Sequence, residues 1–149
     1  MKSLLSITFA LLFGLASTAQ AQSAQVQQVS DRDDVFRQLV TIQMVESLAS
    51  PNAMIRNQTL KNAIVFNTLY PERADLYRVV SSIAAVAESD VSESNRRLAV
   101  AALRSIDSYR ARQYLAEIDG MEDADFHRLV AGVLTEYREA RVNANTRRM

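Results

Sequence analysis

The sequence contains no cysteine, a single histidine, two prolines and three glycines among its 149 residues. Without cysteine the chain has no disulfide bond, thiolate metal site, cysteine nucleophile or cysteine-linked lipid. So few glycines and prolines leave little material for tight turns. No segment alternates polar and apolar residues with the period of two that is typical of a strand. The composition therefore predicts an all-α protein.

Residues 1–21 have the three parts of a secretory leader. Lys2 supplies the positive charge, residues 4–15 are mostly apolar, and residues 19–21 (AQA) are a suitable cleavage site. We expect cleavage after Ala21 and a protein that is periplasmic or extracellular. The apolar run is about twelve residues, whereas a membrane-spanning helix needs about twenty. We therefore expect no stable membrane span once the leader is removed.

Cleavage would leave 128 of the 149 residues and would remove Lys2, so the formal net charge would change from 0 to −1. A chain of this length can bury a core without covalent cross-links. A net charge so close to zero gives no electrostatic reason to expect binding to nucleic acid or to an anionic membrane.

The mature chain divides into a linker, one domain and a tail. Residues 22–30 are rich in Gln, Ser and Ala and predict a flexible linker. Residues 31–142 predict an all-α domain, and the polar residues 143–149 predict a frayed tail. Periodicity and capping residues predict helices at 31–49, 53–70, 72–88, 92–106, 109–118 and 122–141.

Each of the last four helices has apolar residues at helical spacing, and these predict its buried face. The helix at 92–106 has so wide an apolar arc that we expect it to pack on two sides. The predicted core residues are, in order, Leu76, Val79, Val80, Ile83 and Val86; Ala99, Ala102, Leu103 and Ile106; Ala111, Tyr114, Leu115 and Ile118; and Phe126, Leu129, Val130, Val133, Leu134 and Tyr137.

The two middle pairs of helices resemble each other. A shift of 39 residues aligns Leu60, Ala63 and Ile64 with Ala99, Ala102 and Leu103, and a shift of 38 aligns Tyr77 and Val80 with Leu115 and Ile118. A period near 40, paired helices and an early arginine in the first helix of each pair resemble the HEAT-repeat and armadillo-like superhelical family, over about residues 50–119.

The resemblance implies a short α-solenoid of antiparallel helix pairs, 53–70 with 72–88 and 92–106 with 109–118. The first and last helices would then be caps. A closed bundle of five or six helices is the alternative.

In such a family the second helix of each pair lines the concave surface that binds partners. The resemblance therefore implies a protein-interaction or scaffold module, and the leader predicts that it acts in the cell envelope. Because residue patterns for catalysis are sparse, we expect no cofactor and no enzymatic activity. Tyrosine and arginine are enriched at binding hot spots. The candidate partner-binding residues on the two second helices are Tyr77, Arg78, Ser81, Tyr109, Arg112 and Gln113.

The alternative function is a small metal-binding or hydrolytic protein that uses His127. Asp123 lies four residues earlier and Glu122 is adjacent to it, so a carboxylate could share a helix face with the imidazole. Two ligands are fewer than a zinc site normally uses. No Gly-x-Ser-x-Gly sequence presents a serine for catalysis with this histidine. A third hypothesis is an envelope-stability factor with no discrete site.

Overall fold

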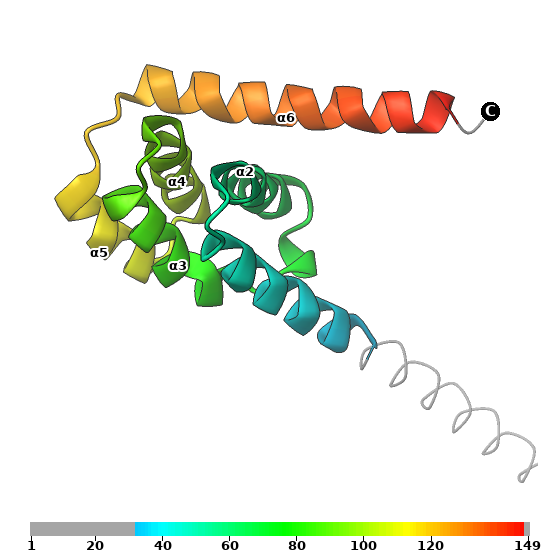
Figure 1. The fold of residues 1–149 in the computed structure, drawn as a ribbon, viewed down its shortest axis with the longest axis horizontal. Helices are drawn as coiled ribbons and strands as arrows, with labels where there is room; N and C mark the ends of the chain where they lie inside the picture. The colour runs from blue at the N-terminus through cyan, green and yellow to red at the C-terminus, as the bar shows by residue number, and fades with distance from the viewer. Residues whose placement is uncertain (1–31, 148–149) are drawn as a thin grey trace, which may run out of the picture. The chain divides into compact units, whose positions relative to one another are not determined.

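The computed structural model describes residues 32–147, and within this range every regular element is helical (Figure 1). The prediction of an all-α protein is therefore confirmed for the described residues. From Arg37 onwards the chain forms one compact unit. The predicted leader at 1–21 and the linker at 22–30 lie outside the described residues and stay predictions.

The first helix spans residues 32–48, of which residues 37–48 belong to the compact unit. It is followed by α2 (Ala53–Leu69), the 3-10 helix η1 (Pro71–Arg73), α3 (Leu76–Ser89), α4 (Glu93–Ile106), α5 (Tyr109–Ile118) and α6 (Asp123–Thr146). Because α6 continues through Thr146, the predicted end of this helix at residue 141 is wrong, whereas fraying of residues 143–149 stays a prediction. The Thr146 hydroxyl donates a hydrogen bond to the carbonyl of Val142, four residues earlier in the same helix.

Polar side chains fix where three of the helices begin. Asn52, Ser92 and Ser108 each precede a helix and accept a hydrogen bond from a backbone N–H of its first turn. Such caps satisfy amide groups that have no partner inside the helix. The starts of α2, α4 and α5 therefore follow from local sequence.

The third helix begins later than the periodicity predicts. Pro71 to Arg73 form a separate 3-10 turn, and Ala74 is extended, with φ −146° and ψ 143°. This break turns the backbone N–H of Asp75 toward the first helix, where it donates to the hydroxyl of Thr41 at 3.1 Å. A tertiary hydrogen bond thus accompanies the interruption of a pattern that looks continuously helical.

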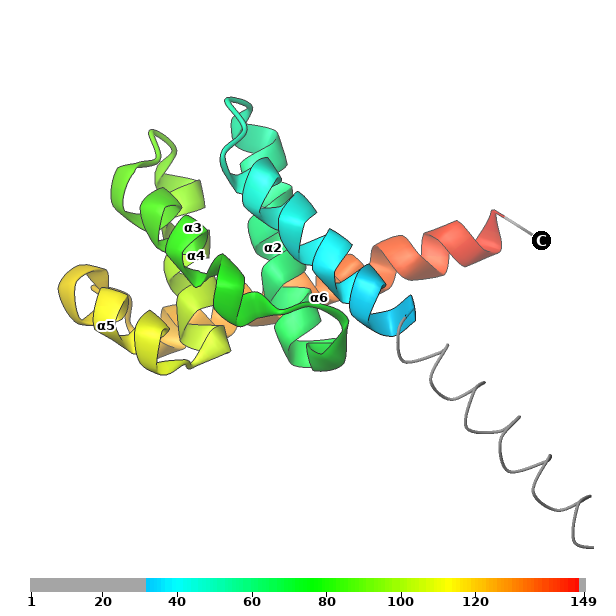
Figure 2. The same ribbon diagram turned by 90° about the horizontal axis from the view of Figure 1, so that it is seen from below.

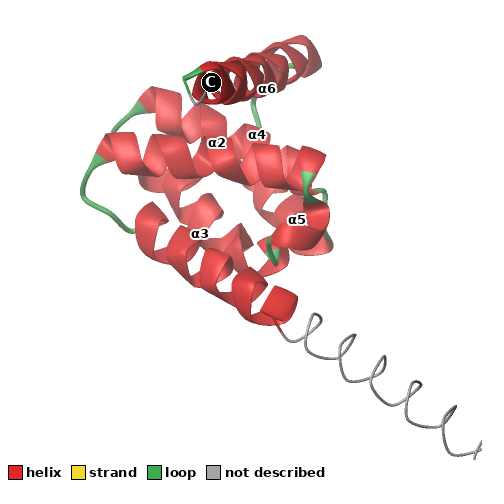
Figure 3. Cartoon of the chain, turned by 90° about the vertical axis from the view of Figure 1, so that its right-hand side faces the viewer, coloured by secondary structure: helices red, strands yellow, loops and turns green. Residues whose placement is uncertain are grey.

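α4 is the central helix, since it packs along both α2 and α3. α2 and α4 lie side by side in one layer, with α3 and α5 on one side of that layer and α6 across the other (Figures 1 and 3). The predicted pairing of 53–70 with 72–88 is wrong, because α2 and α3 have little contact with each other. Both helices have apolar arcs wide enough for several neighbours, so the pattern did not specify which helix would pack on each side.

α2 and α4 run parallel and in register. Near their N-terminal ends the side-chain amide of Asn57 donates to the side chain of Asn95 at 2.9 Å. Near their C-terminal ends the amide of Asn67 donates to the carbonyl of Ser105 at 2.6 Å. Both pairs are 38 residues apart in sequence. The two helices that the sequence aligned at a shift of 39 are therefore direct neighbours in space.

The core forms where α2, α3 and α4 meet. All the predicted core residues of α3 and α4 are buried, and Leu60, Ile64, Ile83 and Leu103 are completely enclosed. In α5 only Ala111 is fully buried, and in α6 only Val133. The other predicted core residues of these two helices are half-buried against the main cluster.

Candidate functional site

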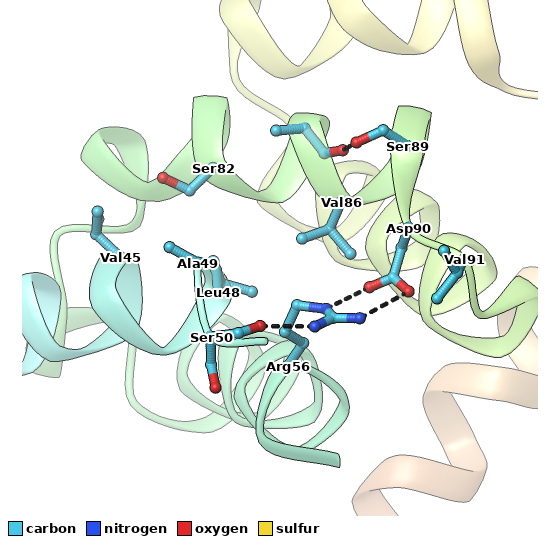
Figure 4. Close-up of a pocket in the computed structure, with 11 residues that line it drawn as sticks. Val45, Leu48, Ala49, Ser50, Arg56, Ser82, Val86, Ser89, Asp90 and Val91 are labelled. Atoms are coloured by element: carbon cyan, nitrogen blue, oxygen red, sulfur yellow. Dashed lines mark hydrogen bonds and ion pairs between the residues drawn. The ribbon is translucent and has the colours of Figure 1, made fainter. Parts of the chain in front are cut away.

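A groove lies between the first helix and α3, two parts of the compact unit that both face the viewer in Figure 2. It encloses a cavity of about 400 Å³, and we call it the α3 groove. Its wall is mostly apolar, with a buried ion pair beneath it. The lining residues are Val45, Leu48, Ala49 and Ser50 after and within the first helix, Arg56 of α2, Ser82, Ala85, Val86 and Ser89 of α3, and Asp90 and Val91 of the following turn (Figure 4).

Arg56 and Asp90 form the ion pair. Nε and Nη2 of Arg56 donate to the two carboxylate oxygens of Asp90 at 2.5 and 3.0 Å. The third nitrogen, Nη1, donates to the carbonyl of Ser50 at 2.6 Å (Figure 4). The Arg56 side chain is 13% exposed and that of Asp90 only 1%. This bidentate geometry ties α2 to the turn between α3 and α4.

Asn95 extends the network into α4. Its side-chain amide donates to Asp90 at 3.2 Å and to the carbonyl of Ala53 at 3.1 Å. The backbone N–H of Ser92 supplies a further hydrogen bond to the carboxylate of Asp90, at 2.8 Å. With these partners the network has its polar atoms satisfied, as a buried cluster requires.

The charges in this network are firmly held. The hydrogen bonds from Arg56 lower the pKa of Asp90 well below its usual value, and those from Ser92 and Asn95 add to the effect. The bond to Asp90 raises the pKa of Arg56 above its usual value. A carboxylate with so low a pKa is a poor proton acceptor near neutral pH, so this pair is suited to holding helices together and not to acid–base catalysis.

An exposed row of apolar side chains on the first helix leads toward the α3 groove. Leu39, Ile42 and Val45 are 59%, 54% and 36% exposed, and Val45 also lines the groove. At the other side of the groove Val91 is 90% exposed. We call Leu39, Ile42 and Val45 the apolar row. It adds a hydrophobic surface beside a cavity that is itself largely apolar.

The sequence reasoning did not identify this groove. Its first-helix residues belong to no motif identified in the sequence, and its ion pair joins residues 34 positions apart. The early arginine of the two aligned helices was the available signal, since Arg56 and Arg96 each stand four residues after the N-cap, in α2 and α4 respectively. Each donates its Nη1 to the carbonyl six residues earlier, which belongs to Ser50 and Asp90 respectively.

The predicted partner-binding residues lie on α3 and α5, which contact each other in the same layer. Ser81 is half-buried and the other five are exposed. Both arginines of the set form ion pairs with nearby residues, Arg78 with Asp75 at 3.0 Å and Arg112 with Asp107 at 3.6 Å. Within α5 the amide of Gln113 donates to the hydroxyl of Tyr109 at 3.2 Å. Whether Tyr77, Arg78, Ser81, Tyr109, Arg112 and Gln113 bind a partner stays a prediction.

His127 is exposed on α6, and its ring lies beside that of Phe126 with centroids 5.1 Å apart. Asp123, its predicted neighbour in a metal site, instead accepts a hydrogen bond from Arg104 at 3.1 Å. Residues 32–147 contain no group of three or more histidine, aspartate or glutamate side chains placed to hold a metal ion. In the same range, none of the helices is both long and apolar enough to cross a bilayer.

Comparisons with known protein families, with curated proteins and with solved structures found no match to this chain. The candidate sites therefore rest on the geometry of the described residues.

Proposed function

We propose that the protein is a non-enzymatic interaction module, built as a short array of HEAT-like helical repeats, that binds a protein partner in the cell envelope. The partner inserts an amphipathic helix into the α3 groove. The observation that carries the proposal is the apolar row of Leu39, Ile42 and Val45, which is exposed to water beside an apolar cavity.

Three features support the repeat arrangement. α2 and α4 run parallel with contacts at a constant offset of 38 residues. Arg56 and Arg96 make the same backbone contact 40 positions apart. In addition, Asp90 and Asp119 each accept from the N–H two residues later and from an arginine of the neighbouring layer. Such recurrence between successive units is typical of helical repeat proteins.

The choice of partner follows from the shape and chemistry of the groove. A groove between two helices that is apolar along its walls suits an amphipathic helix, whose side chains at positions i, i+3 and i+7 fill it. Covering the apolar row would remove exposed hydrophobic area from water, and about 25 cal/mol is gained per square ångström buried. The leader at residues 1–21 supports a location in the periplasm or outside the cell.

The test places a photo-crosslinking amino acid at Ile42 and, in a second chain, at Tyr77. Cells make the full chain, and crosslinked products are recovered from the envelope fraction. We expect one defined protein product from Ile42, which disappears when Val45 is replaced by glutamate. A matched control, Gln43→Glu, adds the same charge on the same helix and should keep the product. Binding in the groove requires burial of the apolar row, so a product that survives Val45→Glu would contradict it.

The α3–α5 surface is the competing location. A product that forms from Tyr77 and is lost in Arg78→Glu/Arg112→Glu, with none from Ile42, would move the site there. The absence of a product from either position would reject the interaction module. The alternative with His127 and the envelope-stability hypothesis would then be the ones to pursue.

A further inference from the structure

A second cavity, of about 450 Å³, lies between the N-terminal part of α4 and the turn that joins α5 to α6. We call it the α4 cavity. It has an apolar part and a charged part, and it lies apart from the α3 groove. Its lining residues are Ala87, Val100, Ile118 and Met121 on the apolar side, Glu93, Arg96, Arg97 and Asp125 on the charged side, and Gly120.

Comparison with Arg56 of α2 indicates what the Arg96 side chain can bind. Arg56, at the matching position, is anchored through Nη1 to the carbonyl of Ser50 and binds a carboxylate with Nε and Nη2. Arg96 has the same anchor, because its Nη1 donates to the carbonyl of Asp90 at 2.6 Å. Among residues 32–147, however, no acceptor is hydrogen-bonded to Nε or Nη2 of Arg96. Arg96 therefore repeats the backbone hydrogen bond of Arg56 but not its pairing with a carboxylate.

The aspartate that corresponds to Asp90 binds another arginine, so the described part of the chain supplies no carboxylate to Arg96. Asp119 stands in the turn before α6 as Asp90 stands in the turn before α4. α5 has 10 residues where α3 has 14, so it is about one helical turn shorter. Asp119 meets Arg104, two turns beyond Arg96, and accepts a hydrogen bond from its Nε at 2.5 Å.

We propose that the α4 cavity binds a small carboxylate that carries an apolar group. The carboxylate accepts hydrogen bonds from Nε and Nη2 of Arg96, and the apolar group lies against Val100 and Ile118. Because the anchor to Asp90 already fixes the guanidinium, little side-chain freedom is lost on binding. Side-on pairing of arginine with a carboxylate is bidentate and stronger than a neutral hydrogen bond. This proposal does not depend on the function of the α3 groove.

The other charges of the cavity are compatible with an anion. Asp125 is compensated twice, by Arg97 at 3.4 Å and by Arg128 at 2.8 Å. Glu93 is in the first turn of α4 and can accept an N–H from the nitrogen next to the ligand carboxylate. A cavity of about 450 Å³ has room for an amino acid or for the last two residues of a peptide.

The ligand chemistry has two sources, a free apolar amino acid and the C-terminus of a peptide. Calorimetric titration of the mature chain, residues 22–149, with four probes separates them: leucine, N-acetyl-leucine, the tripeptide acetyl-Ala-Ala-Leu and the same tripeptide with a C-terminal amide. Tightest binding of leucine identifies an amino-acid site, and tightest binding of the tripeptide acid identifies a peptide C-terminus. Binding of the tripeptide amide as tightly as the best of the acids would overturn the proposal, as would no binding of any acid at millimolar concentration.

Two variants test the site itself. Arg96→Gln removes the guanidinium group and should weaken binding of the tightest-binding acid by about tenfold or more. Gly120→Leu should fold, because a Cβ added at Gly120 meets nothing within 4 Å and the described glycines have no positive φ that would strain it. Since Gly120 lines the cavity, the leucine side chain should narrow it and weaken binding of the acid. The matched control is Arg110→Gln, an exposed arginine outside the cavity, which should bind like the wild type. If Gly120→Leu is folded and binds unchanged, the acid does not occupy this cavity.

Discussion

Replacing Asp90 by alanine removes the carboxylate that joins α2, α4 and the turn between α3 and α4. The side chain accepts four hydrogen bonds, from Nε and Nη2 of Arg56, from the N–H of Ser92 and from the amide of Asn95. Breaking a buried ion pair by removing one partner costs about 3 to 5 kcal/mol. The remaining arginine keeps its bond to Ser50 and some exposure to water, so we expect the lower end, about 3 kcal/mol.

The assay is urea unfolding of residues 22–149, followed by circular dichroism at pH 7. The free energy of unfolding of Asp90→Ala should be about 3 kcal/mol lower than that of the wild type. The control is Arg112→Ala, which removes an exposed pair whose side chains are 65% and 74% exposed. Exposed pairs contribute about 1 kcal/mol or less. Equal losses in the two variants would refute the structural role of the network.

The same variant gives a prediction about pH. The pKa of Asp90 is lowered in the folded protein, so the unfolded chain binds a proton there more readily. The stabilisation is therefore complete above the unfolded pKa of about 3.9 and is lost as the pH falls toward the lowered value. The difference between wild type and Asp90→Ala should narrow below about pH 4. A difference that stays constant between pH 7 and pH 3 would contradict this assignment.

Two further substitutions test the core and the attachment of α6. Leu103→Ala truncates a side chain that is 0% exposed and should lower the free energy of unfolding by about 3 kcal/mol. Leu39→Ala, at a position that is 59% exposed, should change it by about 0.5 kcal/mol or less. Similar effects of the two substitutions would contradict the packing described for α4. The hydroxyl of Tyr137 lies 3.1 Å from that of Tyr70, and this hydrogen bond together with burial raises the pKa of Tyr137. In an alkaline absorbance titration Tyr137→Phe should remove the step at highest pH, and a curve that loses a lower step instead would show that α6 is attached differently.

The contribution of the sequence differs from helix to helix. Ser92 and Ser108 mark the starts of α4 and α5, because capping is a contact between near neighbours in the chain. In the turn before α4 the local pattern does not show what Asp90 binds. Asp90 accepts from the N–H of Ser92, and Ser92 itself caps α4. Asp90 is engaged mainly by Arg56, a distant residue that the local pattern does not include.

The candidate sites were less predictable than the helices. The α3 groove depends on which sides of the first helix and α3 face each other, and the α4 cavity depends on where the turn between α5 and α6 meets α4. Neither the groove nor the cavity alters the periodicity of any single helix. The six predicted partner-binding residues are on α3 and α5, but one of the two helix pairs from which they were inferred, 53–70 with 72–88, is not found in the structure.

The sequence by itself determined the helical class, the helix starts at Ala53 and Tyr109, and the buried faces of α3 and α4. These depend on spacing and capping over one or two turns, which any short stretch of chain encodes. Only the tertiary structure decided that α4 packs between α2 and α3, that Asp90 pairs with Arg56, and that Asp119 meets Arg104 in place of Arg96. The apolar face of a helix does not specify which helix it will pack against, and a charged side chain does not specify its partner. Both are chosen by how all the helices fit together at once.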